Sequence, residues 1–495
     1  MGCLGSLNMW AFLALVCLLA SRAVFEVDLR FPLAEEIKVT PRSESEHGIV
    51  GERSEERVEQ VGWRAPIIIV PGLAASKLEV KLNRVGGQGG EGDENGPLKN
   101  CERVRDWSLT WMNANDLRKG RCFRDQMRLI LEEEEVDVSK SSGQWSWIIR
   151  RIKGGKTEKK KRIRARNVPG VEVRPLQFGG LKGITSMLSL TSSGKWTIAV
   201  DKMSKLVGGI KEGGWRENST LFGAPYDWRY APTAGLKSSK KFYDDLTALV
   251  ERAVRQTGHK SVLVGHSMGS LRITHFLSMK SKKWKNENVK AFISIAAPFG
   301  GSLQSVKSIL LGDTGGIPFT PDDFFHEIQK TSTSGLWLTP RRQTFGDEQV
   351  VLSTPTKNYT VGDVAEALRD GGLHDQATLL EEVLGLDVWK NVKSLGVETI
   401  CLYSTNVRTF AGVTLDFDLK SINSSAVSKP KVSYNYEGDG LVNEKSLREC
   451  EHFADQVKTF DGVGHRHILA NKEVLDIILS TATISAKGQV AHQQR

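Results

Sequence analysis

The 495-residue sequence lacks a hydrophobic run long enough to cross a membrane. Its longest apolar run, WAFLALVCLLA, covers residues 10–20, whereas a transmembrane helix needs about 20 apolar residues. No internal repeat is visible either, which argues against a repeat array. The short apolar run instead has the length of the hydrophobic core of a signal peptide.

A basic surface spread along the chain is also absent. The sequence holds 68 Lys and Arg against 58 Asp and Glu, which gives a net charge of +10. Residues 150–166 alone hold ten basic residues and one acidic residue, so the rest of the chain is nearly neutral. This distribution argues against nucleic acid as a partner. With 39% hydrophobic and 25% charged residues, the composition is that of a folded globular protein.

The basic run at 150–166 allows three interpretations. A run of like charges is commonly a solvated loop with no role of its own. The same charges would bind an anionic leaflet, an attraction that salt weakens. The exposed Lys-Lys-Lys-Arg162 run would also be open to basic-specific proteases of the secretory pathway.

The sequence has only six cysteines, and their positions relative to the amino-terminal apolar run help to predict where the protein is located. Residues 1–23 are predicted to be a signal peptide, although no Lys or Arg precedes the apolar run. Lipidation at Gly2 and Cys3 is the competing interpretation. Removing the leader leaves four of the six cysteines, an even number that suits disulfides. We therefore expect a secreted protein or one in the lumen of the secretory or endolysosomal pathway.

Other polar features of the sequence fit this compartment. Sequons for N-glycosylation occur at Asn218, Asn358 and Asn423. Residues 24–63 are charged and have no periodic apolar face, so they are expected to form a mobile amino-terminal segment. Residues 481–495 are expected to form a polar tail.

The central part of the chain alternates strand-like and helical patterns. Apolar, β-branched runs predict buried strands at 66–70, 196–200, 261–264, 289–295 and 398–403. Helical patterns cover 237–256 and 268–279. This alternation predicts an α/β fold with a parallel sheet and helices on both faces. Residues 74–195 and 300–395 break the alternation and are expected to be insertions over the sheet.

A candidate nucleophile lies between one of these strands and the next helix. Gly265-His-Ser-Met-Gly269 matches the G-x-S-x-G pattern, and it follows the apolar run 261–264 and precedes the amphipathic run from Met268. This is the strand, turn and helix order that exposes a catalytic serine on a strained turn. Ser267 is the predicted nucleophile.

A serine hydroxyl needs a histidine to take its proton and a carboxylate to orient that histidine. Asp439 lies between two glycines after the strand-like run 431–434, which would present its carboxylate from a strand end. Either His465 or His467 follows the strand-like run 456–460, and spacing does not choose between them. The oxyanion would be held by two backbone amides, those of Leu73 after the first strand and Met268 after the nucleophile.

Several ordered motifs of this chain resemble the lecithin:cholesterol acyltransferase family, which includes lysosomal phospholipase A. The similar stretches run from about residue 64 to residue 480 and are IVPGL at 69–73, WMN at 111–113, GAPYDWR at 223–229, GHSMG at 265–269, FISIAAPFGG at 292–301, NYT at 358–360, GDG at 438–440 and GVGH at 462–465. The GAPYDWR run is the most specific of them.

The resemblance implies an α/β-hydrolase core at 64–480 that carries a cap at 300–395 and a lid at 101–122. It implies Ser267 as nucleophile, Asp439 as acid and His465 as base, since Gly-x-x-His followed by Leu-Ala-Asn aligns with the family segment. It also implies disulfides that pair Cys101 with Cys122 across the lid and Cys401 with Cys450.

The resemblance further implies serine-dependent transfer of an acyl chain from a phospholipid to a sterol, another lipid alcohol or water. The expected partners are a phospholipid membrane or lipoprotein surface and a lipid alcohol, and no metal or organic cofactor is expected. The alternative is a lipid-binding or transfer protein that retains an inactive hydrolase fold. The product pattern on phosphatidylcholine liposomes with and without cholesterol would separate these functions.

Two departures and one lid feature add further expectations. Leu441 stands where the family commonly has Thr, and the insertion at 132–166 is longer and more basic than the family pattern. Trp107 and Trp111 lie in the lid, where aromatic rings would suit a membrane interface. We therefore expect a disulfide-braced lid that exposes both rings to lipid, with packing in a small core as the alternative.

Overall fold

The computed structural model describes most of the chain between residues 64 and 484. The described residues are 64–83, 98, 101–102, 104–111, 113–117, 119–137, 159–185, 187–189, 197–199, 202–232, 237–314, 324–389, 392–422 and 429–484. The predicted signal peptide, the segment 24–63 and residues 485–495 of the predicted tail lie outside them. None of the helices within the described residues has both the length and the apolarity needed to cross a bilayer.

The core of the described chain is a six-stranded sheet in the order β17-β14-β11-β10-β1-β9, with every neighbouring pair parallel. Its strands are β1 (Ile67–Val70), β9 (Leu221–Gly223), β10 (Ser261–His266), β11 (Val289–Ile295), β14 (Glu398–Thr405) and β17 (Gln456–Asp461). All residues of β1 and β10 are buried. Because alternate side chains of a strand point to opposite faces, both faces of this sheet are covered.

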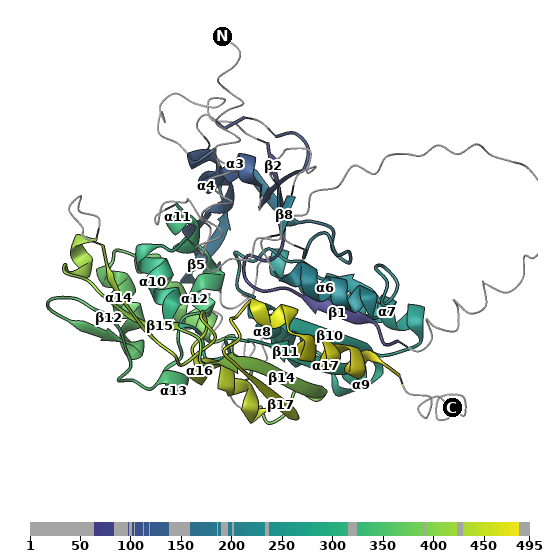
Figure 1. Ribbon diagram of the computed structural model, residues 1–495. Coiled ribbons are helices and arrows are strands. Elements are labelled where there is room, and N and C mark those ends of the chain that lie inside the picture. The colour runs from purple at the N-terminus through teal and green to yellow at the C-terminus, as the bar shows by residue number, and fades with distance from the viewer. Residues whose placement is uncertain are drawn as a thin grey trace, which may run out of the picture.

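Helices α7 (Lys237–Thr257), α8 (Met268–Ser278), α9 (Lys282–Asn288) and α17 (Lys472–Ala482) pack against the strands of this sheet (Figure 1). Helix α6 (Met203–Glu212), which precedes β9, packs against α17. The predicted alternation of strands and helices is therefore confirmed. The last helix begins where Asn471 accepts hydrogen bonds from the amides of Glu473 and Val474, which caps its first turn.

One predicted core strand lies elsewhere in the fold. The run 196–200 forms β8 (Thr197–Ala199), which pairs antiparallel with β7 (Met187–Ser189) outside the core sheet. The edge of the core sheet is instead β9, which pairs with β1 and has only three residues. A run this short carries too little pattern to be recognised in sequence.

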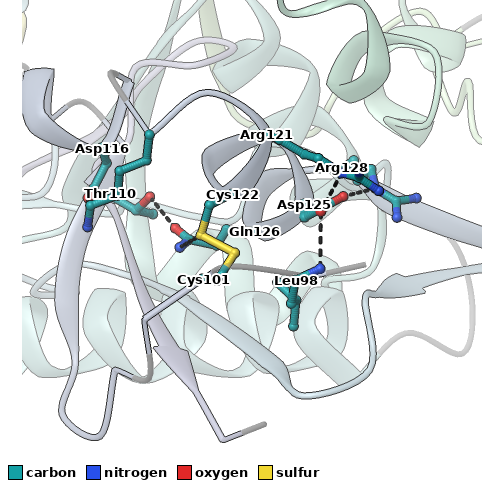
Figure 2. Close-up of a disulfide and its surroundings, with 10 residues drawn as sticks. Leu98, Cys101, Thr110, Asp116, Arg121, Cys122, Asp125, Gln126 and Arg128 are labelled. Carbon is teal, nitrogen blue, oxygen red and sulfur yellow. Dashed lines mark hydrogen bonds and ion pairs between the residues drawn. A yellow bond between two sulfur atoms is a disulfide. The ribbon is translucent and has the colours of Figure 1, made fainter. Parts of the chain in front are cut away.

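The segment from residue 101 to residue 127 forms a small subdomain at the top of Figure 1. It contains β3 (Ser108–Trp111), α3 (Ala114–Leu117) and α4 (Arg121–Met127), and β3 joins the antiparallel sheet β3-β2-β6 with β2 (Leu78–Leu82) and β6 (Val171–Pro175). A disulfide joins Cys101 to Cys122, as predicted, with Thr110 and Gln126 hydrogen-bonded beside it (Figure 2).

Residues 300–395 contribute the helices of the cap, which lies to the left in Figure 1. Strands β12 and β13 of this segment join β15 and β16, which come from beyond residue 395, in a second sheet of order β13-β12-β15-β16. The chain therefore returns to the cap after β14. The elements of this region are α10 (Leu303–Leu311), α11 (His326–Gln329), α12 (Thr333–Trp337), α13 (Arg342–Phe345), β12 (Val350–Ser353), β13 (Asn358–Thr360), η2 (Val361–Asp363), α14 (Val364–Asp370), α15 (His374–Leu384), β15 (Thr409–Thr414), η3 (Leu419–Ser421) and β16 (Lys431–Asn435).

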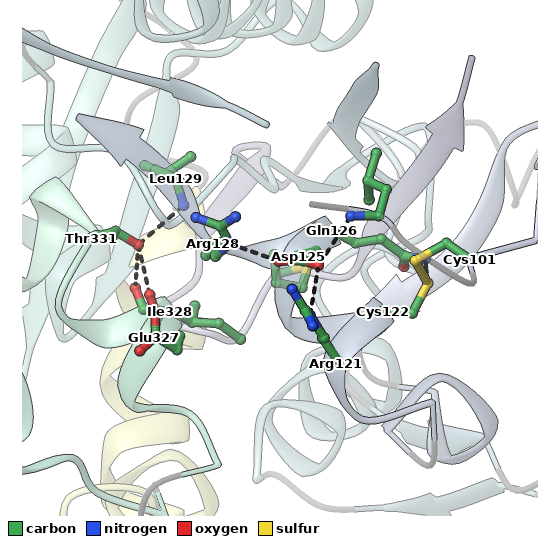
Figure 3. Close-up of polar contacts among 12 residues, drawn as sticks. Cys101, Arg121, Cys122, Asp125, Gln126, Arg128, Leu129, Glu327, Ile328 and Thr331 are labelled. Atoms are coloured by element: carbon green, nitrogen blue, oxygen red, sulfur yellow. Dashed lines mark hydrogen bonds and ion pairs between the residues drawn. A yellow bond between two sulfur atoms is a disulfide. The ribbon is translucent and has the colours of Figure 1, made fainter. Parts of the chain in front are cut away.

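A polar contact directly after the small subdomain of residues 101–127, here named the lid subdomain, joins β4 (Leu129–Asp137) to the cap. The amide of Leu129 donates to the Thr331 hydroxyl at 3.1 Å, and that hydroxyl donates to the carbonyl of Glu327 at 2.8 Å (Figure 3). In the lid subdomain, Asp125 accepts from Arg128 at 2.8 Å and from the amide of Leu98 at 3.1 Å. The chain that leaves the lid subdomain is therefore anchored to the cap.

The basic run continues into a strand instead of ending as a loop. Strand β5 (Lys159–Asn167) pairs antiparallel along its whole length with β4 (Leu129–Asp137), whose sequence is LILEEEEVD. The cations of β5 lie opposite acids of β4, with ion pairs of Lys161 with Glu133 at 2.7 Å, Arg164 with Glu134 at 3.0 Å and Arg166 with Glu132. For residues 159–166, the interpretation as a solvated loop is therefore wrong, and residues 150–158 lie outside the described residues.

One cation of this hairpin reaches the cap. Arg162 makes a bidentate contact with Glu382 of α15, at 2.9 Å from Nε and 2.6 Å from Nη2. The hairpin contributes buried residues to the core, among them Leu129, Ile163 and Ala165. Its outer part is held by backbone pairing and exposed ion pairs, which are each worth about 0.2–1 kcal/mol and are weakened by salt.

We expect proteolysis of this hairpin to depend on ionic strength. Trypsin should cleave after Arg162, Arg164 and Arg166 faster in 1 M than in 0.1 M sodium chloride, because salt screens the ion pairs that hold the outer strands. Timed digestion with mass mapping measures this, and the rate at which trypsin cleaves a short unstructured peptide at each salt concentration corrects for protease activity. Equal rates at the two salt concentrations would contradict the role given to the ion pairs.

Candidate active site

Loops that follow strands of the core sheet meet at its carboxyl edge. Leu73 follows β1, Ser267 follows β10 and His465 follows β17. Asp439 follows β16 (Lys431–Asn435), the strand predicted at 431–434, which belongs to the second sheet and not to the core sheet. A β-bridge to Val407, just after β14, holds Asp439 at this edge. Ligand sites of parallel sheets form at such an edge.

Ser267 lies on a strained turn between β10 and α8. Its backbone has φ 53° and ψ −128°, which is uncommon for a residue other than glycine. A Cβ on Gly265 would lie 2.7 Å from the Cα of Ser270, and one on Gly269 would lie 2.2 Å from the carbonyl oxygen of Val70. Both flanking glycines are therefore needed for close packing. Together with the parallel sheet, this sharp turn between strand and helix, here named the elbow, is that of an α/β-hydrolase fold.

The carboxylate of Asp439 is buried and fully engaged. Its Oδ2 lies 2.6 Å from Nδ1 of His465, and its Oδ1 accepts from the amides of Leu441 at 3.1 Å and Val442 at 2.8 Å. The amide of His465 also donates to the carbonyl of Asp439 at 2.7 Å. Because Leu441 contributes its main chain, the side chain at this position is free to differ from Thr. Nδ1 faces the carboxylate, so Nε2 is left to exchange a proton.

The structure distinguishes the two histidines that the sequence left open. His465 is buried, and its ring centroid lies 5.0 Å from that of His266, the residue before Ser267. His467 is exposed and begins the short helix η5 (His467–Ala470). His465 is therefore the imidazole that lies beside both Asp439 and the elbow.

The loop after β1 lies against the elbow. A Cβ on Gly72 would lie 3.0 Å from Cβ of Ser267 and 3.2 Å from Nδ1 of His266, so this loop approaches as closely as glycine permits. The next residue, Leu73, is 41% exposed. Met268 is the first residue of α8, where amides lack partners within the helix.

Comparisons with known proteins identify the family of this chain. The family model described as lecithin:cholesterol acyltransferase matches residues 148–396. The lysosomal phospholipase A and acyltransferase of Homo sapiens is 30% identical over 84% of this chain and 89% of its own length. This chain belongs to the lecithin:cholesterol acyltransferase family. It is also 28% identical to the lecithin-cholesterol acyltransferase-like 1 of Arabidopsis thaliana (85% of this chain, 90% of the relative) and 26% identical to the phosphatidylcholine-sterol acyltransferase of Gallus gallus (85% and 88%).

The two lid tryptophans of this family member differ in environment. Trp111 is 6% exposed, and its ring centroid lies 4.8 Å from that of Trp228 and 5.9 Å from that of Phe325. The prediction that its ring is exposed to lipid is therefore wrong, because it packs in an aromatic core. Trp107 is partly exposed and lies under the guanidinium of Arg174 at 4.2 Å.

His266 is a site residue whose role the sequence analysis did not recognise. Its Nε2 lies 3.0 Å from the carbonyl oxygen of His465, so it donates a hydrogen bond to the loop that carries the base. Burial lowers the pKa of His266 to about 3, with a further contribution from the nearby His465 ring. The ring is thus neutral at physiological pH. Its position directly before the nucleophile was the available signal.

We expect two histidines, the buried His266 and the partly buried His275, to make folding sensitive to acid. Besides His266, burial and the nearby Arg272 lower the pKa of His275 to about 4. Between pH 6.5 and about 4, the unfolded chain binds protons at these positions and the folded chain does not. The free energy of unfolding therefore decreases as the pH is lowered through this range. Each histidine contributes up to about 1.4 kcal/mol per pH unit. Above pH 6.5 both states are neutral and this effect vanishes.

Urea unfolding at several pH values measures this effect. The variant His275→Phe keeps a ring beside Tyr243, and it should lose less stability than the wild type between pH 6.5 and pH 4.5. The same loss in both proteins would show that His275 does not contribute.

Other predicted sites stand as follows. Asn218 and Asn358 are exposed, and Asn423 lies outside the described residues. A disulfide joins Cys401 of β14 to Cys450 of η4 (Arg448–His452), which follows α16 (Glu444–Leu447). No group of metal-ligating side chains occurs among the residues that the structure describes.

Proposed function

We propose that this protein is a serine acyl enzyme that takes a fatty acyl chain from a glycerophospholipid and transfers it to a lipid alcohol such as a sterol, or to water. The observation that carries the proposal is the 2.6 Å contact of Asp439 with His465 beside a serine held in an elbow conformation. Relatives named as phosphatidylcholine-sterol acyltransferase and as lysosomal phospholipase A and acyltransferase support the substrate class.

The proposed reaction has two steps. Ser267 attacks the ester carbonyl while Nε2 of His465 takes its proton, and Asp439 stabilises the imidazolium that forms. The amides of Leu73 and Met268 hold the charged oxygen of the tetrahedral intermediate. His465 then returns the proton to the departing lysophospholipid, which leaves an acyl group on Ser267.

In the second step, His465 activates an alcohol or a water molecule, which attacks the acyl ester and releases Ser267. The triad performs the same chemistry with either acceptor. The balance between transfer and hydrolysis therefore depends on which molecule occupies the site during this step.

A single experiment tests the proposal and its acceptor. The purified protein is incubated with phosphatidylcholine liposomes with and without cholesterol, and products are measured by mass spectrometry. Lysophospholipid with sterol ester supports acyl transfer, and lysophospholipid with free fatty acid supports phospholipase activity. Neither product, with retained liposome binding, would overturn the proposal in favour of a lipid-binding protein.

We place this activity in the secretory or endolysosomal lumen, at a phospholipid surface. The disulfides Cys101–Cys122 and Cys401–Cys450 support this location, because such bonds persist in oxidising compartments. One group of relatives is also named lysosomal.

A further inference from the structure

The loop formed by residues 71–74, here named the oxyanion loop, is held by two aromatic side chains from distant parts of the sequence. The hydroxyl of Tyr226 donates to the carbonyl oxygen of Pro71 at 2.9 Å. The indole Nε1 of Trp111 donates to the carbonyl oxygen of Ala74 at 2.7 Å. These two hydrogen bonds bracket Leu73, whose amide is the proposed oxyanion donor.

Tyr226 is fixed on several sides. It is buried, and its amide donates to the hydroxyl of Ser76 at 3.1 Å. The guanidinium of Arg272 lies over its ring at 4.6 Å, and the ring of Phe242 lies 5.3 Å away. Burial raises the pKa of Tyr226 well above its usual value, so its hydroxyl remains a donor across the physiological range.

Trp111 approaches the loop from the lid subdomain. It ends β3, and its ring is packed among Phe123, Trp228 and Phe325. The apolar surface of the Trp111 ring is covered by these aromatic residues, and its indole N–H donates to the carbonyl oxygen of Ala74. Trp111 therefore connects the disulfide-closed lid subdomain directly to the loop beside the nucleophile.

The oxyanion loop packs tightly against the start of α8 and against Ser267. A Cβ on Gly269 would lie 2.5 Å from the carbonyl oxygen of Pro71, and Gly72 contacts Ser267. Ala74 has φ 60°, a left-handed conformation that costs energy for alanine. A loop in this state keeps its shape only where surrounding groups hold it.

We propose that Tyr226 and Trp111 are positioning residues that orient the oxyanion loop for catalysis. Tyr226 fixes the peptide unit before Gly72 and Trp111 fixes the one after Ala74, so the Leu73 amide points at the oxygen that becomes charged. This inference rests on the oxyanion role given to Leu73 under the proposed function. It assigns a catalytic consequence to the tyrosine of the Ala-Pro-Tyr-Asp-Trp-Arg run and to a lid residue.

The chain offers matched controls for removing each donor. Tyr226→Phe and Trp111→Phe delete a hydroxyl and an indole N–H that bind this loop. Tyr243→Phe and Trp337→Phe make the same chemical changes at buried residues that do not bind this loop. The hydroxyl of Tyr243 faces Arg272, and the indole nitrogen of Trp337 has no hydrogen-bond partner among the described residues. Volume loss is thus equal within each pair, and only the first member of each pair loses a hydrogen bond to the oxyanion loop.

The first measurement is the rate at which a small alkyl fluorophosphonate labels the protein. In this reaction the Ser267 oxygen bonds to phosphorus, the P–F bond breaks, fluoride leaves and the hydroxyl proton passes to His465. The phosphoryl oxygen occupies the oxyanion position, and no phospholipid is needed. Tyr226→Phe and Trp111→Phe should label about 10- to 100-fold more slowly, the scale of a misplaced catalytic group, and the controls should label like the wild type.

The second measurement is hydrolysis of phosphatidylcholine vesicles. The two donor variants should lower kcat by the same factor as the labelling rate and leave KM unchanged, because the hydrogen bonds act on the transition state. Equal rates in Tyr226→Phe and Tyr243→Phe, and in Trp111→Phe and Trp337→Phe, would overturn the inference. Normal labelling of the wild type without phospholipid turnover would instead count against the proposed substrate and leave the labelling result to decide the positioning roles.

Discussion

Ser267→Ala is expected to lower phospholipid turnover on the order of 10⁶-fold, to the limit of detection. The change removes the atom that becomes acylated and little volume from a buried turn, so the fold should remain intact. Turnover is measured as lysophospholipid release from phosphatidylcholine liposomes, and the fold is checked by thermal unfolding and by liposome binding.

Ser294→Ala is the matched control. Ser294 lies on β11, is fully buried, and its hydroxyl has no hydrogen-bond partner among the described residues. It should keep wild-type activity. If Ser267→Ala retained more than a small residual rate, the nucleophile assignment would be wrong.

His465→Ala is expected to be nearly as severe, because members of a triad act as a unit and their losses are not additive. The change removes the base and leaves the Asp439 carboxylate buried without its 2.6 Å partner. Some loss of stability should accompany the loss of turnover, because an unpaired buried charge is costly.

His467→Ala provides the comparison within the same loop. His467 is exposed, two residues from His465, and its removal should leave kcat close to that of the wild type. A dead His467→Ala with an active His465→Ala would reverse the assignment. Fluorophosphonate labelling should follow the same order, since the base is also needed to activate Ser267 for that reaction.

The core fold could be predicted because its strands are long, apolar and continuous. The runs at β1, β10 and β11 are almost entirely buried, so they consist mainly of apolar residues and are visible in sequence. The elbow was visible for the same reason, since its serine follows one of these strands. β9 was missed because three residues carry no pattern, although it forms the sheet edge beside β1.

The contacts that surround the site could not be predicted as well from the sequence. Trp111 was expected at a lipid surface because composition does not tell an exposed aromatic cluster from a packed one. The pairing of the basic run with an acidic strand was not predicted, because β4 is separated from β5 by a long stretch of sequence. Asp439 was assigned from its motif, but its route through the second sheet depends on a bridge to Val407 that no local pattern encodes.

If the chain were cleaved between β4 and β5, the position of β1 in the core sheet would determine whether the two pieces stay together. Both cysteines of the Cys101–Cys122 bond lie before such a cut, so no described disulfide would link the two pieces. Yet β1 lies between β9 and β10, inserted in a sheet otherwise built from the later piece. The earlier piece would carry Leu73 and the later one Ser267, Asp439 and His465. Such a cut would create a two-chain enzyme with a shared active site, whose halves could be expressed separately and tested for complementation.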